Sequence, residues 1–111
     1  MIFNKTKKIP ISKQELRCKN VFSQARGLMF RKKKQNLIMI FKKERFISLH
    51  NFFVSYPTEI LILDKNKKVV EINNQFKPFT FYNPEKKGKY VIELGKDESK
   101  GKVTFNDYLK I

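Results

Sequence analysis

One stretch of the chain, residues 60–72, constrains the fold more than any other, because it has the pattern of two strands joined by a tight turn. Residues 60–63 are a continuous apolar run with the length of a buried strand. Residues 64–67, Asp-Lys-Asn-Lys, follow directly, and Asp and Asn tolerate turn geometry. Residues 68–72 then return as the second strand of a hairpin. The centre of the chain is therefore expected to lie in an antiparallel sheet.

Further short strands are expected around this hairpin. Residues 37–41 are continuously apolar, which favours a strand buried on both faces, and residues 42–45 should form a polar turn after it. Residues 13–19 alternate between polar and apolar side chains, which is typical of a half-buried strand. A long loop is expected over residues 73–89, and the remaining strands are expected at residues 90–94 and 108–111.

One short helix is expected within residues 20–29. Asn20 is a good helix N-cap, and the apolar residues after it recur at three- and four-residue spacing. Many short strands and one helix predict the fold class α+β, with a compact, mainly antiparallel, barrel-like β-sheet and one short α-helix. The chain of 111 residues has the size of one domain. We expect residues 1–10 to be an N-terminal arm or edge strand and residues 11–111 to form that domain.

The charge of the chain narrows the classes of partner. Lysine and arginine outnumber aspartate and glutamate by 25 to 10, and the formal net charge is +15. Such a field attracts polyanions, namely RNA, DNA or an anionic membrane surface. A composition rich in Lys, Asn, Ile and Phe is also typical of AT-biased codon usage, in which case the lysines are only solvated surface. The candidate polyanion contact consists of Arg31, Lys32, Lys33, Lys34, Lys42, Lys43 and Arg45.

The cysteine count and the apolar runs bear on the cellular compartment. A single cysteine, Cys18, excludes an intramolecular disulfide and gives no sign of an oxidising compartment. No apolar run approaches the ~20 residues that a membrane helix needs. Residues 1–10 are basic but have no apolar segment behind them, so we expect no signal peptide. We therefore expect a cytoplasmic protein without a membrane span.

His50, the only histidine, and Glu59 are candidates for an acid–base pair. They fall short of the three or four ligands that a protein zinc site uses, so we expect no metal. Glu59 directly precedes the apolar run 60–63 and needs a partner if it is buried, for which Arg26 and Arg31 are candidates. A ligand cleft around Arg26, Arg31, His50 and Glu59 is one hypothesis; a structural ion pair and an exposed Glu59 are the alternatives.

The sequence contains no catalytic motif. It has no phosphate-binding glycine loop, no nucleophile elbow and no pair of carboxylates with acid–base spacing. It predicts no cofactor and favours a binding domain over an enzyme. Aromatic residues follow one another closely between Phe76 and Tyr82, among them Phe79 beside Lys77 and Pro78. They either stack on bases, as in proteins that bind single strands, or cover one end of the sheet.

Several segments resemble one known family. Residues 25–31, Ala-Arg-Gly-Leu-Met-Phe-Arg, match the A-R-G-L-M-F-R block of the domain of unknown function 192 family. Residues 50–64 resemble the archaeal version of its next block, and residues 89–94 match its K-Y-V-I-E-L segment. The resemblance covers roughly residues 11–111.

Five positions depart from the pattern of that family. Glu59 stands where the family usually has Asp, and Asn51 and Thr58 replace apolar residues. Lys67 and Asn106 replace glycines that are common in its turns. The family is uncharacterised, so the resemblance implies a small compact domain and no established activity. Two functions are therefore considered: a small non-enzymatic binding or accessory domain whose unknown ligand lies in the cleft described above, and a basic domain that binds nucleic acid, either RNA or another single strand.

Overall fold

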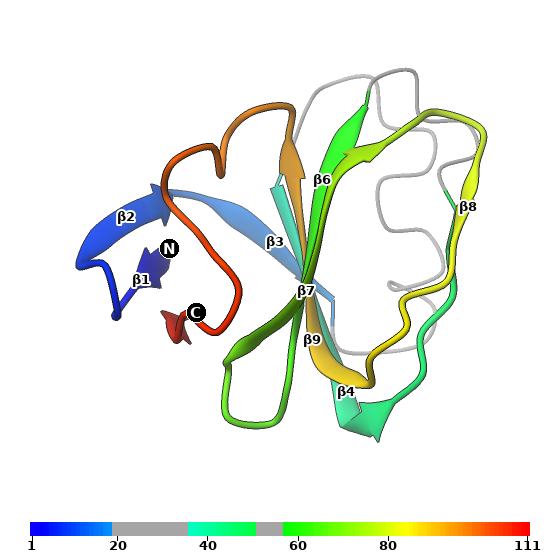
Figure 1. Ribbon diagram of the computed structural model, residues 1–111, viewed down its shortest axis with the longest axis horizontal. Helices are drawn as coiled ribbons and strands as arrows, with labels where there is room; N and C mark the ends of the chain where they lie inside the picture. The colour runs from blue at the N-terminus through cyan, green and yellow to red at the C-terminus, as the bar shows by residue number, and fades with distance from the viewer. Residues whose placement is uncertain (19–35, 51–56) are drawn as a thin grey trace.

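The computed structural model describes residues 1–18, 36–50 and 57–111, and these residues form ten strands in three sheets (Figure 1). The largest sheet has five strands in the order β3-β4-β9-β6-β7. Its neighbouring strands are antiparallel, except that β3 runs parallel to β4. Its strands are β3 (Glu15–Cys18), β4 (Asn36–Arg45), β6 (Thr58–Leu63), β7 (Val69–Phe76) and β9 (Gly88–Gly95).

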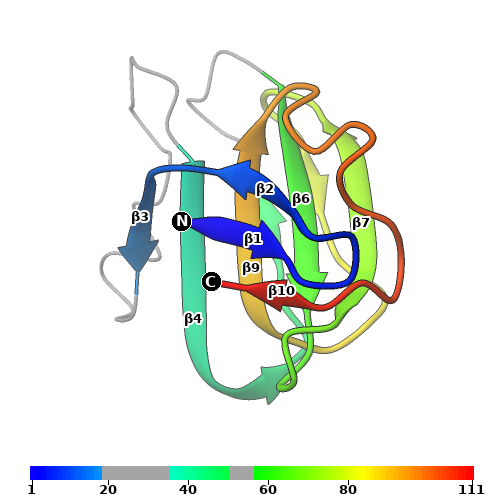
Figure 2. The ribbon, with the colours of Figure 1, turned by 90° about the vertical axis from the view of Figure 1, so that its left-hand side faces the viewer.

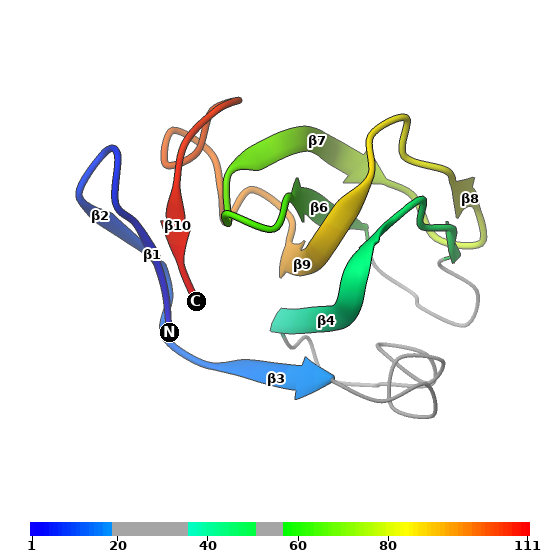
Figure 3. The same cartoon turned by 90° about the horizontal axis from the view of Figure 1, so that it is seen from below.

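Two smaller sheets flank the large one. The first has the order β10-β1-β2 and brings the two ends of the chain together, since Phe3 pairs with Lys110. Figure 2 shows this sheet in front of β9 and β6, and Figure 3 shows it on the side of the large sheet away from β8. The second sheet pairs β5 with β8. The bounds are β1 (Ile2–Asn4), β2 (Ile9–Ser12), β5 (Leu49–His50), β8 (Phe81–Tyr82) and β10 (Leu109–Lys110).

The alternation of side chains along each strand divides the core into two clusters. In β6, Ile60 points to one face of the large sheet and Leu61 to the other, and both are fully buried. Leu49 of β5 packs on the first face, and Leu109 of β10 packs on the second. Cluster 1 consists of Leu37, Met39, Ile47, Leu49, Ile60, Ile62, Phe76 and Val91. Cluster 2 consists of Ile2, Ile11, Ile38, Leu61, Leu63, Val69, Ile92, Leu94 and Leu109.

The fold class expected from the sequence, α+β with one short helix, is wrong. About 57% of the described part is strand and none of it is helix, so the fold is all-β. The physical reason is that strands cover both faces of the large sheet: the β10-β1-β2 sheet packs on cluster 2, and the β5–β8 pair packs on cluster 1. Residues 20–29, where the helix was expected, lie outside the described residues. Within those residues, no helix is long and apolar enough to cross a membrane.

The limits of several strands also differ from expectation. The large sheet has two edge strands, β3 and β7, so a barrel-like closure is not confirmed. β4 continues through residues 42–45, where a turn was expected, because Arg45 still pairs with Gly88 of β9. The loop expected over residues 73–89 is interrupted, since β7 continues to Phe76, β8 follows, and β9 begins at Gly88.

The hairpin between β6 and β7 is confirmed, and Asp64 closes its turn. The backbone carbonyl of Asp64 accepts a hydrogen bond from Lys67 N at 3.0 Å, and Asp64 Oδ1 accepts from Asn66 N at 2.8 Å. Lys67 has a φ of 64°, and Asn106, in the turn before β10, has a φ of 74°. At both positions, the family that the sequence resembles commonly has glycine, the residue that adopts positive φ at least cost.

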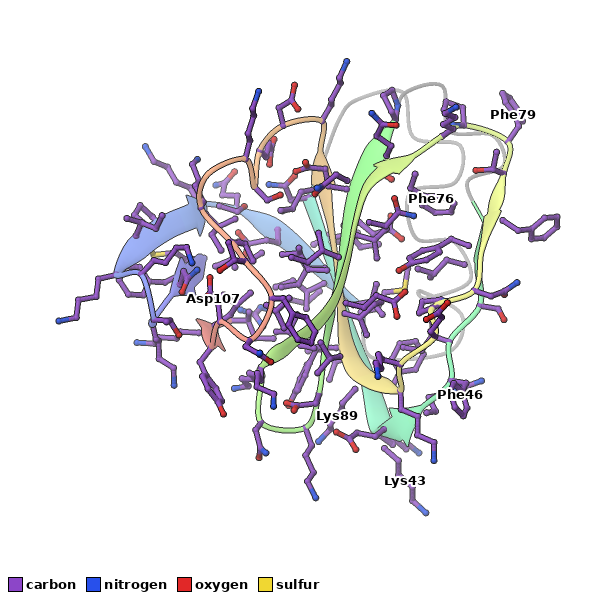
Figure 4. All side chains as sticks on the ribbon, in the orientation of Figure 1. Lys43, Phe46, Phe76, Phe79, Lys89 and Asp107 are labelled. Atoms are coloured by element: carbon purple, nitrogen blue, oxygen red, sulfur yellow. The ribbon has the colours of Figure 1, made fainter. Side chains whose placement is uncertain are left out.

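A buried hydrogen-bond cluster around Asp107 joins the first and last segments of the chain (Figure 4). Asp107 Oδ2 accepts from Asn4 Nδ2, Lys7 Nζ and Thr104 N, each at 2.8 Å. Burial opposes the charge of this carboxylate, but the bonds from Lys7, Asn4 and Thr104 outweigh burial and lower the pKa of Asp107 to about 2. We call these four residues the Asp107 clasp.

Candidate functional site

One end of the large sheet carries basic side chains from three separate segments. The ladder between β4 and β9 places Arg45 beside Gly88. The hairpin turn reaches across to β4, because Lys65 donates its backbone N–H to Glu44 Oε2 at 2.7 Å. We call this surface the basic end. It consists of Lys42, Lys43 and Arg45 of β4, Lys65 and Lys67 of the hairpin, and Lys87 and Lys89 around the start of β9, with Lys43 and Lys89 labelled in Figure 4.

Aromatic rings lie among these cations. Lys67 Nζ and Lys89 Nζ lie 5.8 and 5.6 Å from the ring centroid of Tyr90. Lys87 Nζ lies 5.4 Å from the ring centroid of Phe46. A cation–π contact holds an ammonium group close to a ring and leaves its charge in place. The basic end therefore offers positive charge and flat apolar rings on the same surface.

The acidic side chains at the basic end are engaged by backbone N–H groups. Glu44 accepts from Lys65 N, and Asp64 Oδ1 accepts from Asn66 N and from Lys68 N at 3.0 Å. The ion pairs found within residues 1–18, 36–50 and 57–111 lie elsewhere, for example between Lys7 and Asp107. The lysines of the basic end are therefore available to an external anion.

Glu71 of β7 fixes the segment that leads into the basic end. Glu71 Oε2 accepts a hydrogen bond from the hydroxyl of Tyr82, and Oε1 accepts from Glu85 N at 2.9 Å and from Lys86 N at 3.0 Å. Burial, followed by the hydrogen bond and the charge of Glu71, raises the pKa of Tyr82 above its usual range, so the hydroxyl keeps its proton. Contacts to β7 thus hold the chain directly before Lys87.

The sequence predicted part of this surface. Residues that pattern reasoning missed come from segments that become neighbours only when β9 pairs with both β4 and β6. The hairpin prediction was the one signal that could have found the lysines of the turn. Three of the predicted contacts lie at the basic end: Lys42, Lys43 and Arg45. The other four lie outside the described residues, so their part stays a prediction: Arg31, Lys32, Lys33 and Lys34. The sequence analysis missed four lysines of the basic end: Lys65, Lys67, Lys87 and Lys89.

Glu59 lies near the opposite end of β6, in the wall of a separate pocket. Its side chain is buried, and Oε1 accepts from Ser99 N at 2.9 Å and from Ser99 Oγ at 2.8 Å. The pocket has a volume of about 270 Å³, and both polar and apolar residues line it. Its lining residues are Glu59, Ile72, Asn74, Asp97, Ser99, Lys100, Gly101 and Val103.

The cleft predicted around Glu59 stays a prediction, because Arg26 and Arg31 lie outside the described residues. The backbone of His50 belongs to β5, which covers the face of cluster 1. Glu59 instead lines a pocket with Ile72 and Val103, which pack against cluster 2. The partner that the structure gives Glu59 is Ser99, which pattern reasoning did not single out.

Two buried polar side chains lie on the cluster 1 face of the large sheet. Glu93 of β9 lies between Leu37 and Ile60 of the adjacent strands and is 5% exposed. Burial raises the pKa of Glu93 to about 7, so the carboxyl group is only partly ionised at neutral pH. Thr58 of β6 is buried as well, and its Oγ1 has no hydrogen-bond partner among the described residues. Among the described residues, no group of three or more His, Cys, Asp or Glu side chains is placed to hold a metal ion.

Comparison with known proteins gives the relationship of the chain. The profile of the family DUF192, described as "Uncharacterized ACR", matches residues 5–110. The chain belongs to the DUF192 family. This confirms the family that the sequence resemblance indicated. The UPF0127 protein PH1112 of the archaeon Pyrococcus horikoshii is 32% identical to this DUF192 chain over 95 residues, which cover 84% of this chain and 82% of that protein.

Solved structures share the fold of this DUF192 domain. A crystal structure of a "putative transcription regulator" from Sinorhizobium meliloti 1021 has a TM-score of 0.78 and 18% identity, and the match covers 85% of this chain and 78% of that one. A protein of unknown function from Novosphingobium aromaticivorans has a TM-score of 0.78 and 17% identity over 86% of this chain and 72% of that one. At this level of identity, the likeness shows the fold alone.

Proposed function

We propose that this DUF192 domain is a non-enzymatic binding domain whose ligand is a nucleic acid, bound through its phosphates at the basic end. The observation that supports this proposal is the convergence of cations from β4, the β6–β7 hairpin and β9 on one surface, together with the rings of Phe46 and Tyr90.

The energetics of the bare surface support a ligand of opposite charge. Like charges that lie close together repel one another, and this repulsion destabilises the compact state. At the basic end the nearby acids, Glu44 and Asp64, accept backbone N–H groups. A polyanion would remove the repulsion and release its own condensed counterions, which makes binding favourable and salt-dependent.

A surface of this kind holds the nucleic acid backbone and does not select a sequence. Lysine ammonium groups contact phosphate oxygens, which are the same at every nucleotide. The proposal therefore requires no catalytic group, no metal and no cofactor. It predicts binding to nucleic acids of many sequences with affinity that falls steeply as salt rises.

The test is a salt titration of binding to a labelled oligouridylate of about 16 nucleotides. The triple variant K43A/K65A/K89A should bind more weakly than the wild type between about 50 and 200 mM salt. Each phosphate contact on a single strand releases about 0.7 counterions, and the variant lacks three lysines. The slope of log affinity against log salt concentration should therefore become less steep by about two.

The matched control is K5A/K13A/K96A, which removes the same number of charges from exposed lysines outside the basic end. This variant should keep the wild-type slope, because a general loss of net charge is not what binding depends on. Failure of the wild type to bind at low salt, or equal effects of the two triple variants, would refute the proposal.

The second candidate is a small-ligand site at Glu59, which the pocket beside Ser99 favours. The Glu59 carboxylate that lines it already accepts two hydrogen bonds from Ser99, which leaves less of it for a ligand. The same titration separates the two candidates. If neither triple variant nor wild type shows salt-dependent binding, the Glu59 pocket becomes the leading site.

A further inference from the structure

Three phenylalanines are exposed along the edge of the molecule that the β5–β8 pair forms. Phe46, Phe79 and Phe81 are 61%, 63% and 69% exposed. Phe46 precedes β5 in the chain, Phe81 belongs to β8, and Phe79 lies in the turn before β8. In Figure 4, Phe79 and Phe46 lie toward opposite ends of this edge. We call these three side chains the ring row.

The packing of β8 points one of these rings outward. Leu49 of β5 pairs with Tyr82 of β8, and both side chains pack on cluster 1. The Tyr82 ring also lies 5.8 Å from the ring of Phe76, and its hydroxyl donates to Glu71. Because successive side chains of a strand point to opposite faces, burial of Tyr82 directs Phe81 toward solvent.

The turn before β8 holds a second ring outward in an unfavourable backbone conformation. Phe79 has a φ of 59°, a region that bulky L-residues rarely adopt. Thr80 Oγ1 donates to the Lys77 carbonyl oxygen at 2.6 Å, and this bond closes the turn around Phe79. Backbone strain of this kind is retained mainly where it places a side chain for use.

The ring row continues the basic end. Lys87, which belongs to the basic end, lies over the ring of Phe46, which is the first member of the row. Cationic grooves that follow the phosphates, combined with aromatic rings on which bases stack, are how proteins bind single strands without sequence preference. In a duplex the bases are already paired and stacked, so exposed rings gain nothing from it.

We infer that the ring row stacks on the bases of a single-stranded nucleic acid whose phosphates lie on the basic end. This inference rests on the function proposed above and adds the form of nucleic acid that is bound. The ligand is a single strand of nucleic acid, because exposed rings that lie along one edge, with Lys87 beside Phe46, can stack on unpaired bases. An anionic membrane surface is the competing partner and is included in the test.

The first experiment compares F79A and F81A with F105A in binding the oligouridylate and a duplex of the same length. Phe105 is 57% exposed but lies in the loop before β10, so it is a control for loss of an exposed ring. F79A and F81A should each weaken single-strand binding about tenfold, with the salt slope unchanged and duplex binding unaffected. F105A should bind both as the wild type does.

The second experiment uses tryptophan as a reporter, because the chain has none. The fluorescence of F79W should be quenched by the oligouridylate and not by the duplex, and that of F105W should not respond to either. This measurement needs no loss of a side chain, so it keeps the test valid if F79A or F81A folds poorly.

The results separate the inference from the proposed function. Salt-dependent binding that F79A, F81A and F79W do not affect would overturn the ring row and leave the basic end in place. A change of F79W fluorescence with anionic phospholipid vesicles and none with the oligouridylate would overturn it in favour of a membrane. Absence of any wild-type binding at low salt would overturn both.

Discussion

Glu93 holds a carboxyl group where its cross-strand neighbours, Leu37 and Ile60, are apolar. Burial raises the pKa of Glu93 from 4.5 to about 7, which means that the folded state favours the protonated form. A glutamate whose pKa is raised on folding contributes no penalty below about pH 4.5. The penalty grows as pH rises toward 7 and is complete above it. Glu93 therefore weakens the fold at neutral pH.

The substitution E93Q tests this cost. Glutamine has nearly the same shape and carries no charge, so the free energy of unfolding at pH 8 should rise by about 3 kcal/mol. At pH 4 the two proteins should have nearly equal stability, and the variant should lose the dependence on pH between about 4.5 and 7. Urea denaturation at several pH values measures this. A variant that is less stable than the wild type at pH 8 would show that ionised Glu93 has a favourable partner.

Among the elements, the β6–β7 hairpin shows a local cost at one position. Lys67 has positive φ at the end of the turn that Asp64 closes. K67G should raise the free energy of unfolding by about 1 kcal/mol, because glycine adopts this conformation without the steric cost that an L side chain meets. K65G is the control, since it removes the same charge in the same turn at a residue without positive φ. K65G should lower the free energy of unfolding. If both variants raised it equally, the effect would come from the lost charge and not from the backbone conformation.

K67G should also weaken oligouridylate binding, because it removes a lysine of the basic end.

The strands also show which parts of the fold local sequence patterns can predict and which they cannot. The β6–β7 hairpin was predictable, because an apolar run and turn residues that lie next to each other in sequence specify it. The extension of β4 to Arg45 was not predictable, since Arg45 pairs with Gly88, which lies far along the chain. The all-β fold was missed for the same reason: β10 joins β1 across the whole chain, and no local pattern reports such a pairing. The sequence singled out Glu59 but not its partner Ser99, which is 40 residues away.

At the scale of the whole molecule, the Asp107 clasp joins β1 and the turn after it to the segment before β10. The pKa of Asp107 falls from 3.8 to about 2 on folding, so its contribution is fully present above about pH 4 and is lost as pH falls through 2. D107N removes the charge that Lys7 and Asn4 support, and the free energy of unfolding at pH 7 should fall by about 2 kcal/mol. K7A removes one donor of the clasp and should cost less. Urea denaturation from pH 7 to pH 2 decides the matter, because D107N should lose less stability than the wild type below pH 4. Parallel acid profiles would show that the ionised carboxylate does not hold the two ends of the chain together.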